Sequence, residues 1–172
     1  MEEMEDPTES LSERIREKAE ESLKEKEKTW AIVAISTAII AVFAAISGLM
    51  AGHFSNEAMM EQIKASDQWS FYQAKGIKAE IKALGVGLGK ADSSEVTRYK
   101  KEQDEIKTEA EDFQKESAAH LKGHISLARS VTLFQVAIAM SALAILTRRK
   151  PLWYLGLLLA VAGVTFFVIG IT

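Results

Sequence analysis

Long uncharged stretches alternate along the chain with segments rich in charge. The stretches without a charged side chain are Trp30–Gly52, Ser130–Leu146 and Leu152–Thr172. At about 1.5 Å per helical residue, the first and the third are long enough to cross a hydrocarbon core of roughly 30 Å. The pattern predicts an all-α integral membrane protein with transmembrane helices at 30–52, 130–147 and 152–171.

Between the first two spans, residues 53–129 form two helical segments with one break. Gly85, Gly87 and Gly89 alternate there and make a continuous helix costly. Asp92 and Glu95 follow with the spacing of a helix cap. The sequence therefore predicts a long antiparallel helical hairpin that projects from the membrane, with its tip near residues 85–92.

The returning helix of the hairpin has a stripe with the heptad spacing of a coiled coil. Its steps of three and four run from the tip into the second span without a slip. The stripe consists of Val96, Tyr99, Gln103, Ile106, Ala110, Phe113, Ser117, His120, His124, Leu127, Val131, Phe134 and Ile138.

The outgoing helix is less regular. Met59, Ile63, Ile77 and Ile81 suggest one apolar face, whereas three aromatic residues, Trp69, Phe71 and Tyr72, point in different directions around the helix. One antiparallel partner cannot cover all three aromatic rings. Either a third helix or a neighbouring subunit must pack there, and we expect a subunit and predict a homo-oligomer.

The distribution of bases predicts the orientation. Lys24, Lys26 and Lys28 precede the first span, and three consecutive bases at 148–150 separate the second span from the third. The positive-inside rule places both flanks in the cytoplasm. The charged N-terminal helical segment 1–29 is then cytoplasmic, while the hairpin and the C-terminus lie outside.

Small residues mark the expected helix contacts within the spans. Such residues let helices approach closely where lipid provides no hydrophobic drive between them. The predicted packing positions are Gly48 and Gly52 in the first span and Gly156, Gly163 and Gly170 in the third. Gln135 lies in the second span, where its amide is expected to bond a neighbouring helix or, alternatively, to line a narrow aqueous path.

Composition argues against several classes of function. Cysteine is absent, which removes thiolate nucleophiles and Cys-based metal sites. Residues 53–129 hold thirteen acids and twelve bases, interspersed, and therefore lack the basic face that nucleic-acid binding needs. No set of nucleophile, base and oxyanion donor is visible. We expect a protein that is not an enzyme and has no cofactor.

The three histidines of the chain are expected to converge just outside the membrane. With a hairpin tip near residue 89, His53 lies beside His124, and His120 is one turn further along the same helix. Histidines four residues apart with a third from a facing helix could bind a metal ion. They could instead titrate as a pH sensor, or simply satisfy local hydrogen bonds at the wet boundary.

The segment from Asn56 to Lys78, with its Trp-Ser-Phe-Tyr-Gln-Ala-Lys run at 69–75, resembles a family signature. Segments 51–53, 99–103, 134–139 and 146–155 look alike as well. The chain is similar, from about Trp30 onward, to the domain-of-unknown-function 4337 family of bacterial membrane proteins. The resemblance implies a bacterial inner-membrane location with three spans, and it implies no catalytic residues.

These features together predict a non-enzymatic, self-associating membrane scaffold whose partners are the lipid bilayer and further copies of itself. No other protein partner can be named from the residues. One alternative is a channel-like oligomer lined by residues such as Ser36, Thr37 and Gln135. The other is a pH or metal sensor built on the histidines.

Overall fold

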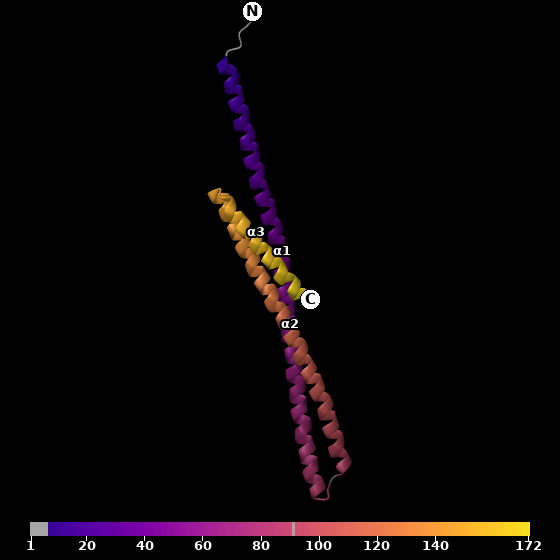
Figure 1. Cartoon of the computed structure of the whole chain (residues 1–172). Coiled ribbons are helices and arrows are strands. Elements are labelled where there is room, and N and C mark those ends of the chain that lie inside the picture. Colours follow the sequence, from indigo (N-terminus) through magenta and orange to yellow (C-terminus); the bar gives the residue numbers. More distant parts are fainter. Residues whose placement is uncertain (1–6, 91) are drawn as a thin grey trace, which may run out of the picture. The chain divides into compact units, whose positions relative to one another are not determined.

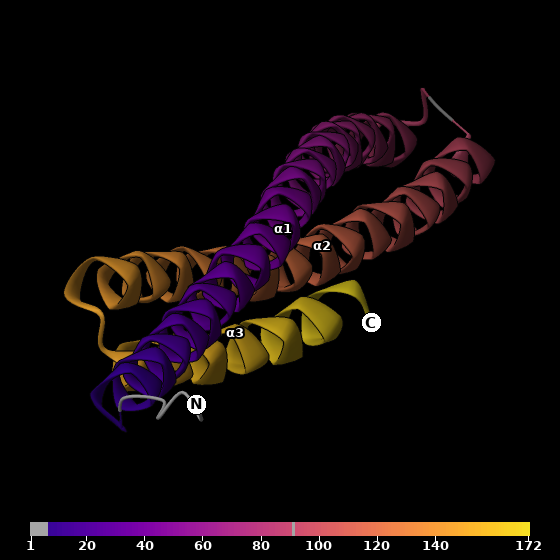
Figure 2. The same ribbon diagram turned by 90° about the horizontal axis from the view of Figure 1, so that it is seen from above.

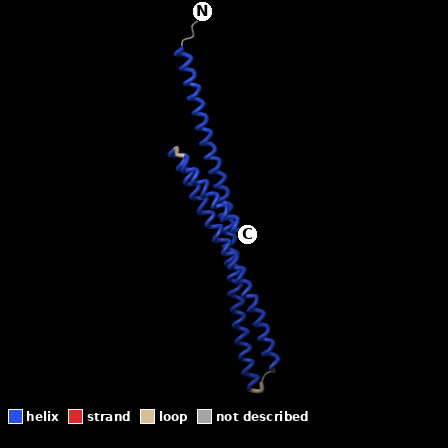
Figure 3. The backbone as a smooth tube through the Cα atoms, in the orientation of Figure 1, coloured by secondary structure: helices blue, strands red, loops and turns tan. Residues whose placement is uncertain are grey.

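Helices form almost all of the described chain, which comprises residues 7–90 and 92–172 of a computed structural model. Helix α1 spans Pro7–Gly87, α2 spans Ser93–Thr147 and α3 spans Lys150–Ile171 (Figure 1). The described residues contain no strand, and short loops connect the helices (Figure 3). The predicted all-α class is confirmed. Each helix contains an 18-residue stretch apolar enough to cross a membrane.

The N-terminal segment is part of α1 and is not a separate helix. Residues 1–6 of the predicted segment 1–29 lie outside the described residues, as do the side chains of residues 7–13 and 15. From Pro7 the helix continues for 81 residues to Gly87. The reason is local, because no proline and no run of glycines interrupts the sequence before Gly85.

The turn after α1 ends the helix with a glycine in the left-handed region. Gly89 has a φ of 68°. The Lys90 N–H donates to the Gly85 carbonyl at 2.8 Å, and the Gly89 N–H donates to the Val86 carbonyl at 2.9 Å. This pair of bonds is the Schellman arrangement, in which a residue without a Cβ is favoured at the position of Gly89.

Asp92 caps the next helix, as the sequence predicts. Its carboxylate accepts a bond from the Ser94 backbone N–H at 3.0 Å, and the Ser94 hydroxyl also donates to it. These bonds to the ionised form hold the pKa of Asp92 below its usual value. Glu95 does not complete a capping box, since it forms an ion pair with Lys82 across the turn at 2.6 Å.

Two substitutions in this turn should have opposite effects on stability. Gly89→Ala should lower the free energy of unfolding by about 1 kcal/mol, because its φ places a Cβ close to the following carbonyl. Gly87→Ala should leave stability unchanged or raise it, since a Cβ there meets nothing within 4 Å. Thermal unfolding followed by circular dichroism tests both, and equal effects would contradict this account of the turn.

The chain divides into two compact units. The first, which we call the three-helix unit, contains the described part of Met1–Ala45 together with Val131–Val164. Its core consists of Ile40, Phe134, Ala137 and Ala160, and Phe134 is only 1% exposed. The Phe43 and Phe134 rings also pack with their centroids 6.1 Å apart. This unit therefore holds parts of all three helices around one aromatic side chain.

The second unit, which we call the hairpin unit, contains Ile46–Ser130 and Thr165–Thr172. In this unit α1 runs toward the loop at its end, and α2 runs back from that loop antiparallel to α1 (Figure 2). Alanines of α1 recur every seventh residue along the contact with α2 and are buried. They are Ala51, Ala58, Ala65 and Ala79, with Tyr72 in the remaining place. Small side chains at this spacing allow the two helices to pack closely.

The heptad stripe predicted for α2 faces its neighbours. Every residue of that stripe, from Val96 to Ile138, is buried or half-buried. Ala110 and Leu127 are completely covered, and Ser117 donates its hydroxyl to the Ala58 carbonyl at 2.8 Å. The register of α2 was therefore predicted correctly from the steps of three and four alone.

Candidate functional site

The face of α1 that contacts α2 in the hairpin unit, which we call the inner seam, has heptad spacing of its own. All of its members are buried or half-buried. They are Ser47, Ala51, Phe54, Ala58, Glu61, Ala65, Gln68, Tyr72, Lys75, Ala79 and Lys82. Beyond Phe54, polar and charged side chains alternate with the alanines. The contact between α1 and α2 is therefore held by polar bonds as well as by apolar packing.

Glu61 is the most buried charged side chain of the inner seam. It is only 7% exposed. One carboxylate oxygen accepts a bond from Lys64 Nζ at 2.8 Å, and this bond raises the pKa of Lys64. The other oxygen, Oε2, has no hydrogen-bond partner among the described residues. Sequence reasoning missed Glu61, although a charge at a heptad position of α1 would have indicated it.

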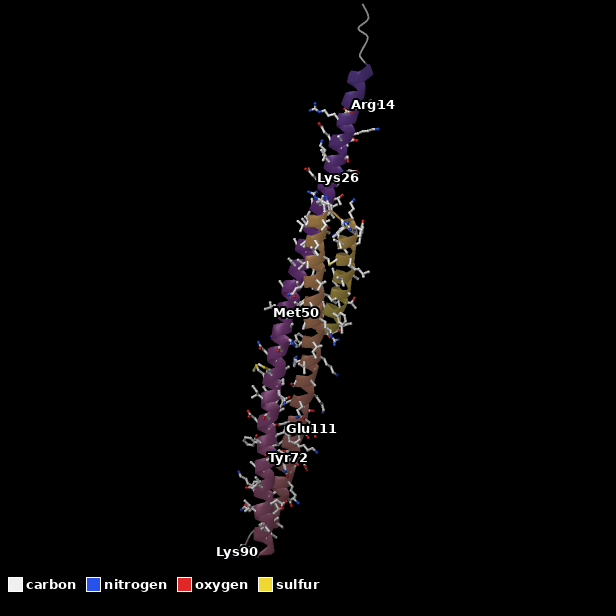
Figure 4. The ribbon with its side chains drawn as sticks, turned by 90° about the vertical axis from the view of Figure 1, so that its left-hand side faces the viewer. Arg14, Lys26, Met50, Tyr72, Lys90 and Glu111 are labelled. Carbon is white, nitrogen blue, oxygen red and sulfur yellow. The ribbon has the colours of Figure 1, made fainter. Side chains whose placement is uncertain are left out.

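Further polar bonds join the two helices toward the loop. Gln68 Nε2 donates to Glu109 at 3.0 Å, and Gln103 Nε2 donates to the Tyr72 carbonyl at 3.3 Å. Lys75 forms an ion pair with Glu102. Figure 4 shows Tyr72 on α1 and Glu111 on α2 in this part of the hairpin unit, with Lys90 at the loop. These side-chain bonds determine which residues of α1 and α2 lie opposite each other.

The ion pair between Lys75 and Glu102 should make the stability of the fold depend on pH in the acidic range. The bond from the ammonium lowers the pKa of Glu102 below its ordinary value of 4.5. The pair therefore stabilises the fold above that value, and the contribution is lost as the pH falls through the lowered pKa. Glu102→Gln should flatten the decline of the melting temperature in this range. Glu105→Gln is the control, because Glu105 is 66% exposed and pairs only within α2; equal flattening by both variants would contradict the prediction.

The histidines do not form the predicted ligand set. His124 Nδ1 lies 2.8 Å from the Ala51 carbonyl, and the His120 ring contacts the edge of Phe54 with a centroid separation of 5.7 Å. His53 is exposed, and its ring lies 6.1 Å from that of Phe54. The part of the chain that the structure describes holds no group of three His, Asp or Glu side chains able to share a metal ion. Phe54 is the ring that contacts both His53 and His120.

The opposite face of α1 in the hairpin unit is a second heptad seam, which we call the outer seam. Steps of three and four again connect its members, and every one of them is exposed. They are Ile46, Leu49, His53, Asn56, Met60, Ile63, Asp67, Ser70, Ala74, Ile77, Ile81 and Leu84. Its large apolar side chains are well exposed, with Leu49 78% and Leu84 70% exposed. Within the described residues, this seam is left uncovered.

The three aromatic residues singled out in the sequence lie in different surroundings. Trp69 and Tyr72 contact each other edge to face with ring centroids 5.4 Å apart, and both are half-buried. Phe71 is 62% exposed and borders the outer seam. The chain itself therefore covers two of the three, and only Phe71 is left for a partner.

The predicted packing glycines fall into two groups. Gly156, Gly163 and Gly170 face α2, where a Cβ on Gly163 would lie 2.8 Å from the Phe134 ring and one on Gly170 would lie 2.7 Å from Leu127. Gly48 and Gly52 are exposed, and a Cβ on Gly52 would meet nothing within 4 Å. Gln135 is exposed too.

The hydroxyl groups in the first apolar stretch bond within the three-helix unit. Ser36 and Thr37 both donate to the Val33 carbonyl, at 2.9 and 2.7 Å. Ser36 also accepts a bond from Trp153 Nε1 at 3.1 Å, which links α1 to α3. Nothing in the sequence indicated that link, since it depends on where α3 packs.

Comparison with known proteins gives one result. No curated protein and no solved structure matches the chain. A family model described as Domain of unknown function (DUF4337) matches residues 29–172, which is most of the chain. The match contains α2, α3 and all but the first part of α1, and therefore both seams of the hairpin unit. The chain belongs to the DUF4337 family.

Proposed function

We propose that this protein is a self-associating, non-enzymatic scaffold of the bacterial inner membrane, whose copies pair along the outer seam of α1. The observation that carries the proposal is the exposure of that seam. Asp67 and Ser70 interrupt the seam between two exposed apolar stretches, and exposed apolar surface marks an interaction site in a soluble segment. A heptad of apolar residues is the pattern that binds another helix.

The membrane placement rests on the three apolar helical stretches and on the distribution of bases. Each stretch is long enough to span a bilayer. With the bases of 24–28 and 148–150 in the cytoplasm, residues 53–129 and the C-terminus lie outside. Residues 53–129 are too charged for the bilayer, and the outer seam from Asn56 to Leu84 therefore faces water.

A second copy of the chain suits the outer seam because the membrane aligns all copies in the same direction. Parallel helices then place each seam residue opposite itself. Among the residues that flank the seam, the pairs brought together across such an interface include Met59 with Lys64 and Gln73 with Lys78. None of these flanking pairs joins like charges. Asp67 is the one seam residue that would oppose a like charge, and it is discussed below.

The alternative functions receive less support. A pore lined by Ser36 and Thr37 is disfavoured because both hydroxyls are already bonded to Val33 of the same helix. A metal sensor is disfavoured because the histidines do not converge on one point. These observations leave self-association through the outer seam as the function that we propose.

The mass of the solubilised protein tests the proposal. The full chain should resist extraction from membranes by alkaline carbonate, and in an uncharged detergent it should have a multiple of the single-chain mass by native mass spectrometry. A protein that is monomeric at every concentration would overturn the scaffold. Release by carbonate would overturn the membrane placement separately.

A further inference from the structure

The hairpin unit contains an open cleft of about 650 Å³ between α2, the end of α3 and one side chain of α1. Two glycines bring these helices together. A Cβ on Gly123 would lie 2.5 Å from the Phe54 ring and 3.1 Å from the Gly170 carbonyl. One on Gly170 would lie 3.2 Å from the Gly123 carbonyl. This close contact forms the floor of the cleft.

The cleft combines an apolar lining with two bases. Phe54, Ile125 and Ile169 supply much of its apolar lining. Lys122 and Arg129 are its cationic side chains, and no Asp or Glu lines it. The two bases are seven residues apart on α2 and therefore share one face of the helix.

Neither base has an ion-pair partner among the described residues. No ion pair within residues 7–90 and 92–172 involves Lys122 or Arg129. The Arg129 guanidinium lies 5.9 Å from the centroid of the Phe166 ring, which positions it without neutralising its charge. Ser126, midway between the two bases, adds a hydroxyl donor. The cleft is thus a set of donors and positive charges beside apolar surface.

The position of the cleft along the chain indicates the kind of anion. Arg129 is the last charged residue before the uncharged stretch Ser130–Leu146, and the lining residues Ile169–Thr172 end the apolar α3. In the membrane placement proposed above, on which this inference rests, the cleft lies where hydrocarbon gives way to the phosphate layer. Basic pockets between helices at that depth recognise anionic lipid head groups.

We propose that this cleft binds the phosphate group of an anionic phospholipid, with Lys122 and Arg129 as the cationic contacts and with Ile169, near the end of the apolar α3, against the acyl chains. Charge-assisted bonds from an ammonium and a guanidinium suit phosphate oxygens. The absence of an acidic side chain from the lining favours a head group of net negative charge over a zwitterionic one. The apolar lining favours a lipid over free inorganic phosphate.

Native mass spectrometry of the full chain in an uncharged detergent tests this site. Phosphatidylglycerol and phosphatidylcholine are added at equal concentrations, and the retained lipid is counted. We expect the wild type to retain phosphatidylglycerol preferentially. The double variant Lys122→Gln with Arg129→Gln should bind it on the order of thirtyfold more weakly, because the loss of each base should weaken the binding about five- to sixfold.

A matched control separates the cleft from general charge. The double variant Lys107→Gln with Lys115→Gln removes two bases from the same helix outside the lining and should retain the lipid as the wild type does. Equal loss in both double variants, or equal retention of the two lipids, would overturn the proposal. Displacement of the lipid by inorganic phosphate at similar concentration would assign the site to the free anion and would overturn it too.

The same spectra keep the two proposals apart. The protein mass reports the assembly, and the lipid increments on each species report the cleft. Monomers that discriminate between the lipids would refute the scaffold and support the cleft. Oligomers that do not discriminate between them would refute the cleft alone.

Discussion

Glutamate in place of both Ile77 and Ile81 should convert the assembly into monomers. These side chains are adjacent members of the outer seam and are 62% and 61% exposed in the single chain. Their replacement therefore leaves the inner seam intact. In a parallel pair each glutamate would face the equivalent glutamate of the other chain, at a position of the seam that is apolar in the wild type. Losing the burial of each isoleucine removes roughly 1.5–3 kcal/mol, and the dissociation constant should rise at least about 100-fold.

The control variant places the same charges beside the seam and not in it. Gln62→Glu with Ala83→Glu adds two acids at exposed positions of α1 that belong to neither seam. Its mass distribution in detergent should match that of the wild type. Dissociation in this control, or an intact oligomer in the Ile77 and Ile81 variant, would show that another surface holds the copies together. Circular dichroism verifies that all variants stay helical.

Asp67 gives a test in the opposite direction. It is exposed at the middle of the outer seam, where a parallel pair brings two carboxylates together. Like charges at such a position weaken a coiled coil and can serve to fix its register. Asp67→Leu should strengthen assembly, and concentration series by sedimentation should show a lower dissociation constant. Weaker assembly in this variant would rule out the parallel, in-register pairing.

Removal of the Phe134 ring should give the largest loss of stability within the chain. The ring is 1% exposed and contacts Phe43, while a Cβ on Gly163 would overlap it. Phe134→Ala leaves a cavity that the neighbouring alanines cannot fill. We expect the free energy of unfolding to fall by about 3–5 kcal/mol. The fluorescence of Trp30 and Trp153, which lie in the same unit, follows unfolding in denaturant.

Val136→Ala is the matched control for Phe134→Ala. Val136 belongs to the same helix and is 44% exposed. Its truncation removes little buried surface and should cost less than about 1 kcal/mol. If the two substitutions had similar effects, the core of the three-helix unit would be organised around some other residue.

Much of α2 could be predicted from the sequence because it has one seam. The predicted stripe lies on a single face, so the steps of three and four identify that face without any knowledge of the partner. The same holds for the turn, where the glycines and Asp92 encode the break locally. These features depend on residues a few positions apart, and the structure places them where the pattern indicated.

The inner and outer seams of α1 could not be told apart from the sequence in the same way. The inner seam includes Ala51 and the outer seam includes His53, two positions apart and therefore on nearly opposite faces of the helix. Apolar residues on both faces blur the periodicity that either would show alone. The inner seam also carries Glu61 and Lys75, which disguises it further. Burial in the structure is what distinguishes the two.

The contacts of single side chains needed the structure for another reason. A hairpin tip near residue 89 brings residues near 53 and 124 together, and the His124 contact with Ala51 agrees with that register. The pairing of residues along the hairpin does not determine the direction in which each histidine side chain points. His53 lies on the outer seam, and its distance from the other two histidines follows from its place on the helix.

The polar inner seam also makes the stability of each copy depend on the concentration of the protein. In the hairpin unit, α1 contacts α2 through alanines and through bonds such as that of Gln68 with Glu109, whereas Ile63, Ile77, Ile81 and Leu84 of α1 are on its outer face. If those side chains are covered only when copies meet, the association adds its free energy to that of the fold. Dilution would then loosen the helices themselves, and the amount of this protein in a membrane would determine how firmly each copy is folded.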